Sequence, residues 1–276
     1  VVGGGKAVAG VAAAIETLAV TAGVAGATVS GLVSVPEGCG RRLDHIEIRQ
    51  TRPACANLPT AAAVVATRDM LAQMEALGPD DLAIAVVTGG GSALLEDPVT
   101  GVSLEDVVAV TRYLSSAGVD IRELNLVRQA LSRVKAGGLA RSCRAGRLLT
   151  VVLSDVIGDS LDLIASGPCM PVVADPLAAF EILARHSATS VAPAVTRRLE
   201  QAIAAGGFRS DDRAGGGEWT TPAGCRVSHV VLGNNATAVD AAARVAAGLG
   251  YEITVRHARP GIEMAEVVGE RLAHEG

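Results

Sequence analysis

Aromatic side chains are scarce in this chain of 276 residues, which contains one Trp, two Tyr and two Phe. Large aromatic rings therefore cannot build its core. Apolar residues still make up 49% of the chain, so small aliphatic side chains must fill the interior. Such side chains suit close contacts between helices and a sheet, and a chain of this length can bury a sizeable core in one or two domains.

Several classes of protein are excluded by what is missing. The five cysteines form no Cys-x-x-Cys pair, which argues against a zinc site or a disulfide framework and fits the reducing cytoplasm. No run of Lys or Arg occurs and the net charge is −5, so no nucleic acid partner is implied. No apolar run is long enough to cross a bilayer, and we expect no membrane partner. A homo-oligomer is left open.

Three familiar site motifs are also absent. Lys6 is followed by Ala7, with no glycine at the earlier position that GxxxxGK[ST] requires. The same stretch lacks the last glycine of GxGxxG, so it is not a good dinucleotide fingerprint. Ser92 stands in Gly91-Ser92-Ala93 rather than in the GxSxG of a hydrolase. A Walker A phosphate loop, a dinucleotide-binding fingerprint and a serine hydrolase are therefore disfavoured.

The most informative stretch that is present is Thr88-Gly89-Gly90-Gly91-Ser92-Ala93, which follows the apolar run 82–87. The length and β-branched content of that run predict a strand buried on both faces. Glycines at its end let the backbone turn and bring N–H groups close to an anion, and Ser92 adds a hydroxyl. We predict the floor of a phosphate or carboxylate pocket at the carboxyl edge of a sheet. The alternative is a tight turn without a ligand.

A second glycine turn opens the chain. Val1-Val2-Gly3-Gly4-Gly5 indicates a strand end, and an Ala-rich helix is expected to follow as far as about residue 22. The start of a helix attracts anions through its free N–H groups, and Lys6 adds a full positive charge there. An ordinary helix start with an exposed lysine is the alternative. Because the chain begins inside this strand without Met, we expect it to be a piece of a longer protein.

Two carboxylates follow another apolar strand, predicted at 148–154. Asp155 and Asp159 come just past its end, where Mg²⁺ and ligands bind in open α/β sheets. Turn and helix-cap chemistry is the alternative for these aspartates. Ser166-Gly167-Pro168 then forms another loop of small residues.

The remaining pattern alternates strands and helices. Strands are expected at 29–35, 45–48, 226–232 and 251–255, and helices at 58–77, 103–116, 121–134, 175–186, 192–204, 235–249 and 262–273, with a loop at 51–57. This alternation predicts an α/β fold with a doubly wound, mostly parallel, Rossmann-like sheet. The domain would span 1–205. Residues 206–276 would hold a linker and a second, smaller, incomplete α/β unit.

On the helix expected at 121–134, Arg128, Ser132 and Lys135 fall on one stripe. Such a stripe is either a solvated basic face or a set of groups directed at a ligand. Together with the glycine turns and the aspartates, these residues suit phosphoryl transfer, in which backbone donors and cations hold phosphates, carboxylates hold Mg²⁺ and a positioned hydroxyl attacks.

Six motifs in this order resemble those of the class II glycerate 2-kinases, with their DUF4147 region and the start of a MOFRL domain. They are Val2-Gly3-Gly4-Gly5-Lys6-Ala7, Thr88-Gly89-Gly90-Gly91-Ser92-Ala93-Leu94-Leu95, Asn125-Leu126-Val127-Arg128-Gln129-Ala130-Leu131-Ser132, Lys135-Ala136-Gly137-Gly138-Leu139-Ala140, Ser154-Asp155-Val156-Ile157-Gly158-Asp159 and Ile164-Ala165-Ser166-Gly167-Pro168. The resemblance covers nearly the whole chain.

The resemblance implies phosphorylation of a small hydroxy acid, D-glycerate, at its 2-hydroxyl with ATP and Mg²⁺, in a cleft between two domains. It implies catalytic roles for Lys6, Arg128 and Asp155 and a metal site at Asp155 and Asp159. The binding residues would be Gly4, Gly5, Gly89, Gly90, Gly91, Ser92, Ser132, Lys135 and Ser166.

The chain departs from the family pattern at two places. It has Arg52-Pro53-Ala54-Cys55-Ala56 in place of His-Pro-x-Pro-Asp, and Gln129-Ala130 in place of Lys-His. Two alternatives stay open. An NAD(P)H-dependent hydroxypyruvate reductase is disfavoured by the missing GxGxxG, whereas the altered 52–56 loop favours a non-catalytic relative that binds an acidic metabolite.

Overall fold

The structure, a computed structural model, describes residues 1–21, 28–206, 217–255 and 257. Within them one sheet of seven strands has the order β3-β2-β1-β4-β5-β7-β6. The strands are β1 (Val2–Gly4), β2 (Gly31–Pro36), β3 (Ile46–Arg52), β4 (Leu82–Thr88), β5 (Arg147–Leu153), β6 (Trp219–Thr220) and β7 (Arg226–Gly233). All neighbours pair in parallel except β6 with β7. The predicted α/β fold with a mostly parallel sheet is confirmed.

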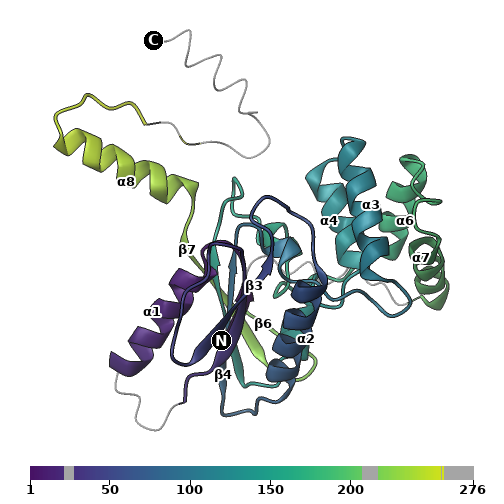
Figure 1. The fold of residues 1–276 in the computed structure, drawn as a ribbon, viewed down its shortest axis with the longest axis horizontal. Coiled ribbons are helices and arrows are strands. Elements are labelled where there is room, and N and C mark those ends of the chain that lie inside the picture. Colours follow the sequence, from purple (N-terminus) through teal and green to yellow (C-terminus); the bar gives the residue numbers. More distant parts are fainter. Residues whose placement is uncertain (22–27, 207–216, 256, 258–276) are drawn as a thin grey trace.

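The strand order reverses between β1 and β4. From β1 the chain moves outward through β2 to β3, and it then returns to place β4 on the other side of β1. Helix α1 (Val8–Thr21) and helix α2 (Ala61–Glu75) cover opposite faces of the sheet (Figure 1). Ligands of open α/β sheets bind outside the carboxyl ends of the strands at such a reversal. In this chain those ends are the two glycine turns.

Small aliphatic side chains fill the core, as the composition requires. On one face, Val8 and Ala12 of α1 pack against Val33, Val86 and Val151 of the sheet. On the other face, a larger cluster joins α2 to the sheet and to the short helix α5 (Gly138–Ser142). Alanines at these contacts let helix and sheet backbones approach closely.

Four helices form a separate cluster beside the sheet (Figure 1). They are α3 (Leu104–Ser116), α4 (Ile121–Ala130), α6 (Pro176–Arg185) and α7 (Pro193–Ala205). Helix α3 begins with a capping box between Ser103 and Asp106, and α6 begins at the N-cap Asp175 with a proline in its first position. Two short 3₁₀ helices, η1 (Gly91–Ala93) and η2 (Ile164–Ser166), lie against each other, η1 beside β1 and η2 beside β4.

Several predicted boundaries are wrong. Strand β3 continues to Arg52, through residues expected in a loop, because 46–52 pairs with β2. Helix α2 begins after the N-cap Thr60, so Pro59 precedes the helix. Residues 251–255, expected to be a strand, adopt no regular structure. The helix expected at 262–273 lies outside the described residues.

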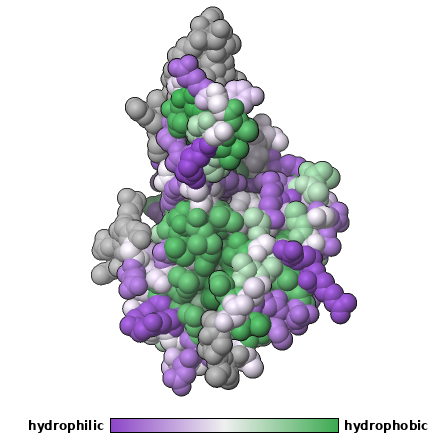
Figure 2. All heavy atoms as spheres, turned by 90° about the vertical axis from the view of Figure 1, so that its left-hand side faces the viewer, coloured by the Kyte–Doolittle hydropathy of each residue, from purple (hydrophilic) through white to green (hydrophobic). Residues whose placement is uncertain are grey.

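The sheet runs across the predicted domain boundary at residue 206. Both β6 and β7 follow that position, and β7 pairs with β5 along its whole length. Helix α8 (Asn235–Gly248) comes next and buries none of its side chains. Figure 2 views the side with α1 and α8 and shows apolar side chains gathered on it; the large exposed ones of α1, β7 and α8 are Leu18, Val20, Val230, Val231, Leu232, Val239 and Val245. The division into two domains stays a prediction.

None of the helices in the described ranges has both the length and the apolar character of a membrane span.

Candidate functional site

The two glycine turns meet at the reversal point of the sheet. The Lys6 N–H donates to the Gly89 carbonyl at 3.0 Å, and the Ala7 N–H donates to Thr88 Oγ1 at 3.1 Å. Gly5 has φ +152° and lies so close that a Cβ there would overlap Thr88 Oγ1. The loops after β1 and β4 are therefore joined by hydrogen bonds and close backbone contact.

Charges of opposite sign flank the loop formed by Gly89, Gly90 and Gly91. A Cβ built on Gly90, whose φ is +83°, would lie 3.1 Å from Arg52 Nη2 and 3.6 Å from Lys6 Cε. A Cβ at Gly89 would overlap Asp155 Oδ2. Only glycines leave room for these side chains, so that Arg52 and Lys6 lie against Gly90 and Asp155 lies against Gly89. Gly4 packs beneath the loop, since a Cβ there would meet Leu95 Cγ at 2.8 Å.

Arg52 was not among the predicted site residues. It is the last residue of β3, where a register shift at Val35 and Pro36 sets it opposite Pro36. Irregularities of this kind redirect side chains near sites. Its backbone carbonyl accepts from the Glu37 N–H at 2.9 Å, and its side chain is buried. The signal available in the sequence was an arginine directly before a proline at a strand end, in a stretch that departs from the family pattern.

The two predicted metal ligands both lie in the segment that follows β5. Asp155 is exposed directly after β5, whereas Asp159, which has φ +51°, accepts a hydrogen bond of 2.6 Å from Asn234 Nδ2 at the end of β7. No cluster of three or more His, Cys, Asp or Glu suited to a metal is found within the described ranges. Two carboxylates nevertheless suit Mg²⁺, which usually keeps several water ligands and is also coordinated by substrate phosphates. The donor set fits that ion.

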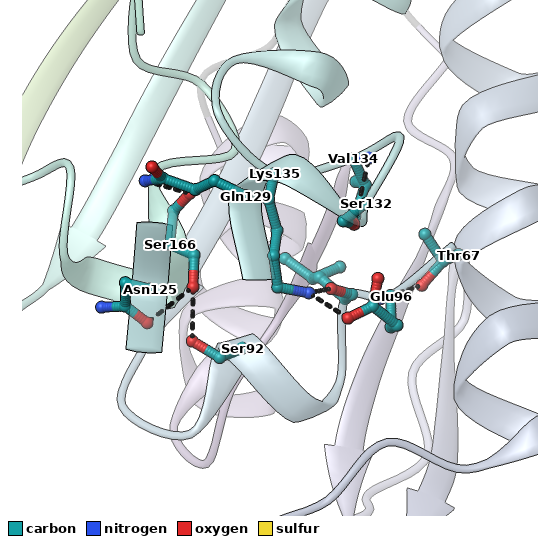
Figure 3. A network of polar contacts seen from close by, with 10 residues as sticks. Thr67, Ser92, Glu96, Asn125, Gln129, Ser132, Val134, Lys135 and Ser166 are labelled. Atoms are coloured by element: carbon teal, nitrogen blue, oxygen red, sulfur yellow. Dashed lines mark hydrogen bonds and ion pairs between the residues drawn. The ribbon is translucent and has the colours of Figure 1, made fainter. Parts of the chain in front are cut away.

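Ser92 and Ser166 are brought together by a network of polar contacts (Figure 3). Their hydroxyls lie 3.3 Å apart, and Ser166 Oγ also donates to Asn125 Oδ1 at 3.1 Å. Gln129 Nε2 donates to the Ser166 carbonyl at 3.3 Å. Ala165 and Ser166 both have positive φ, at 51° and 62°, a conformation that costs about 1–3 kcal/mol per residue and persists where the surroundings fix it. The hydrogen bonds of this network hold the backbone of Ser166 in that conformation.

Lys135 is fully buried beside that network (Figure 3). Its Nζ donates to Glu96 Oε2 at 2.6 Å and to the Leu95 carbonyl at 2.8 Å, and the side chains of Lys135 and Glu96 are 0% and 2% exposed. Burial lowers the pKa of Lys135, while the Glu96 carboxylate opposes that change. Burial also lowers the pKa of Arg128, again opposed by Glu96. The Glu96 carboxylate thus opposes the pKa change of both predicted cations but is bonded only to Lys135, and Lys135 does not belong to a solvated face.

The predicted stripe of Arg128, Ser132 and Lys135 on one helix is wrong, because α4 ends at Ala130. Beyond it the Arg133 N–H donates to the carbonyl of Asp97 at 2.8 Å, and the buried Asp97 carboxylate accepts from Arg133 Nη1 at 2.9 Å. Because of these contacts the chain does not continue as a helix. Ser132 is buried, accepts from the Val134 N–H at 3.4 Å, and lies across Lys135 from Ser166 (Figure 3). The structure does not bring Ser132 to the glycine loop.

A separate small pocket lies on the sheet between β4, β5 and β7, lined in part by Val87, Thr150 and His229. His229 Nε2 lies 3.0 Å from the Cys169 carbonyl, and burial lowers the pKa of His229. This pocket is distinct from the glycine loop.

We expect stability to decrease in acid because of His229. With its pKa lowered in the folded protein, the unfolded chain takes up a proton first as the pH falls below about 6.5, which favours unfolding until the folded-state pKa is passed. Urea unfolding between pH 8 and pH 5 should therefore show a decline that is smaller in His229→Gln. An identical decline in both proteins would contradict the assignment.

The reversal point, the two glycine turns and the flanking charges define an α/β protein whose carboxyl sheet edge carries two adjoining glycine turns and charged side chains. The chain belongs to the DUF4147 family, described as a domain of unknown function, which matches residues 1–200.

Named relatives are similar over most of the chain. A glycerate kinase of Bos taurus is 35% identical over 266 residues, which are 92% of this chain and 48% of the relative. A protein of Agrobacterium vitis with the provisional name of hydroxypyruvate reductase is 39% identical over 189 residues, 67% of this chain and 41% of that protein. The crystal structure of a glycerate kinase from Thermotoga maritima matches with a TM-score of 0.71 and 29% identity, over 91% of this chain and 55% of that one. The chain thus spans about half the length of the relatives it matches.

Proposed function

We propose that this chain is part of an enzyme that transfers a phosphoryl group from ATP to the 2-hydroxyl of D-glycerate, giving 2-phosphoglycerate. The observation that carries the proposal is the meeting of Lys6, the loop 89–91 and Asp155 at the reversal point of the sheet. The similarity to glycerate kinases supports the same reaction. Since the chain spans half of those relatives, the activity is proposed for the longer protein that contains it.

The residues would have different roles in phosphoryl transfer. Lys6 is exposed beside the loop, so its ammonium can neutralise the charge that develops on the transferred group. Glycines at 89–91 leave the backbone open for phosphate oxygens to approach. Asp155 and Asp159 would hold Mg²⁺, which supplies charge neutralisation on the phosphates.

A second group of residues would hold the substrate in position. Ser92 is partly exposed beside the loop, where its hydroxyl can donate to an oxyanion or a hydroxyl group, and the buried Ser166, which donates to Asn125, would hold Ser92 in position. Arg128 carries a positive charge close to Glu96 and Lys135, and the excess of two cations over one carboxylate favours an anionic ligand nearby. We place the reaction in the cytoplasm, since the five cysteines are free thiols, as expected in a reducing compartment.

The test is an ADP-release assay on the longer protein with ATP, Mg²⁺ and D-glycerate. We expect ADP to form only when D-glycerate is present and to stop when EDTA removes the metal. Consumption of NADH with hydroxypyruvate, and no ADP release, would instead favour the reductase that some relatives are named for. Binding of D-glycerate by calorimetry without turnover would favour a non-catalytic protein.

A further inference from the structure

Arg52 presents an unused hydrogen-bonding edge at the glycine loop. Its side chain is 3% exposed, and its Nη1 donates to the carbonyls of Pro53 and Ala56. The Nε of the same guanidinium is buried and has no hydrogen-bond partner among the described residues. A buried donor without a partner is costly, so an acceptor that reached this edge of Arg52 would be bound favourably.

The geometry of the guanidinium defines what that acceptor must be. Nε and Nη2 form one side of the planar group, and Nη2 is the atom next to Gly90. Two parallel N–H donors on a rigid plane match the two oxygens of a carboxylate. The contacts of Nη1 hold the plane in place, so little entropy is lost when an acceptor binds.

The charges around the loop separate the two anions of the proposed reaction. Asp155, on the Gly89 side, repels a free carboxylate but suits phosphates that carry Mg²⁺. On the Gly90 side, Arg52 and Lys6 lie together, so an acid bound there places its hydroxyl between the two sides. We propose that the Nε–Nη2 edge of Arg52 binds the carboxylate of the hydroxy acid substrate and makes the enzyme selective for acids. This inference rests on the proposed function for the identity of the acid.

The test compares the longer protein with its variants Arg52→Gln and Arg52→Lys. We expect the KM for D-glycerate to rise about 10- to 100-fold in Arg52→Gln, as for the loss of a charge-assisted pair, with the KM for ATP unchanged. Arg52→Lys should rescue little, because an ammonium lacks the planar fork. Selectivity for D-glycerate over its neutral amide should fall in both variants.

The control is Arg49→Gln, which removes a guanidinium from the same strand. Arg49 is partly exposed and pairs with Glu47 and Asp69, away from the loop. Its KM values should stay at the wild-type level. The melting temperature of each variant shows whether it is folded, and if Arg52→Gln is not, Arg52→Lys carries the test, since it keeps the aliphatic stem and the charge.

The two proposals fail differently. An unchanged KM for D-glycerate in a folded Arg52 variant, or a raised KM for ATP instead, overturns the role of Arg52 and leaves the reaction standing. If the wild-type protein releases no ADP with D-glycerate, the reaction is wrong. Calorimetry with D-glycerate then tests the role of Arg52 by itself. Weaker binding by Arg52→Gln than by the wild-type protein supports that role. Equal binding by the two proteins, or no binding by the wild-type protein, overturns it.

Discussion

Replacing Lys6 by alanine is expected to lower kcat with D-glycerate by about 100- to 1000-fold, the usual loss when one preorganised donor to a developing anion is removed. The ammonium would stabilise charge that is greatest in the transition state, so kcat should fall more than the KM values change. The measurement is ADP release at saturating ATP and D-glycerate. Turnover at the wild-type level would contradict the role.

The fold should survive this change. The side chain of Lys6 is exposed, and the contacts that hold its loop come from the backbone N–H groups of Lys6 and Ala7. The free energy of unfolding should therefore change by no more than about 0.5 kcal/mol. The matched control is Arg197→Ala, which removes an exposed cation from α7, in the helical cluster beside the sheet, and should leave kcat unaltered.

A chemical readout supports the same test without a mutation. Lys6 and Lys135 are the only lysines of this chain, and Lys135 is fully buried. An amine-selective reagent should therefore modify Lys6 in the folded protein, as peptide mapping can show. Protection of Lys6 by ATP with Mg²⁺ is the expected result, and equal labelling with and without the nucleotide would count against it.

The strands and turns that depend on the local sequence pattern could be predicted from the sequence. Apolar runs of five to seven residues become β4 and β5, and the glycine turns after β1 and β4 lie where parallel strands end. Because parallel strands share one carboxyl edge, the meeting of Lys6 with the loop 89–91 followed from the fold class.

What depends on pairing between distant residues could not be read from the pattern. Residues 49–52 are polar and a loop was expected to begin at Thr51, but β2 pairs with them and makes Arg52 a buried strand residue. Helix α4 was expected to continue, but Asp97, far away in sequence, accepts from Arg133 and ends it. Lys135 lies buried because Glu96, 39 residues earlier, compensates its charge. Local propensity contains none of this information.

Replacing Glu96 by glutamine is expected to destabilise the protein by about 3–5 kcal/mol, the cost of removing one partner from a buried ion pair. Lys135 would keep its hydrogen bond to the Leu95 carbonyl but lose the carboxylate that balances its charge in the buried interior. Since the free energy of unfolding of a domain is only about 5–15 kcal/mol, urea unfolding should readily detect this loss of stability. The substitution conserves size, so it leaves no cavity.

Two further measurements separate the ion pair from a general packing defect. The double variant Glu96→Gln/Lys135→Met has no buried charge at either position and should recover most of the lost stability, because replacing both partners removes the uncompensated ion. If the double variant is as unstable as Glu96→Gln alone, the charge is not the cause.

The pH dependence gives the sign of the effect independently. Burial lowers the pKa of Lys135 and Glu96 opposes this, so loss of Glu96 lowers that pKa further. Between the folded-state pKa and the unfolded value of about 10.4, the unfolded chain binds more protons, and stability rises with pH. The rise should therefore begin at lower pH and be larger in Glu96→Gln than in the wild-type protein. An identical pH profile for the two would show that Lys135 does not carry the charge assigned to it. The proposed excess of positive charge of Arg128 and Lys135 over Glu96 would then be wrong as well.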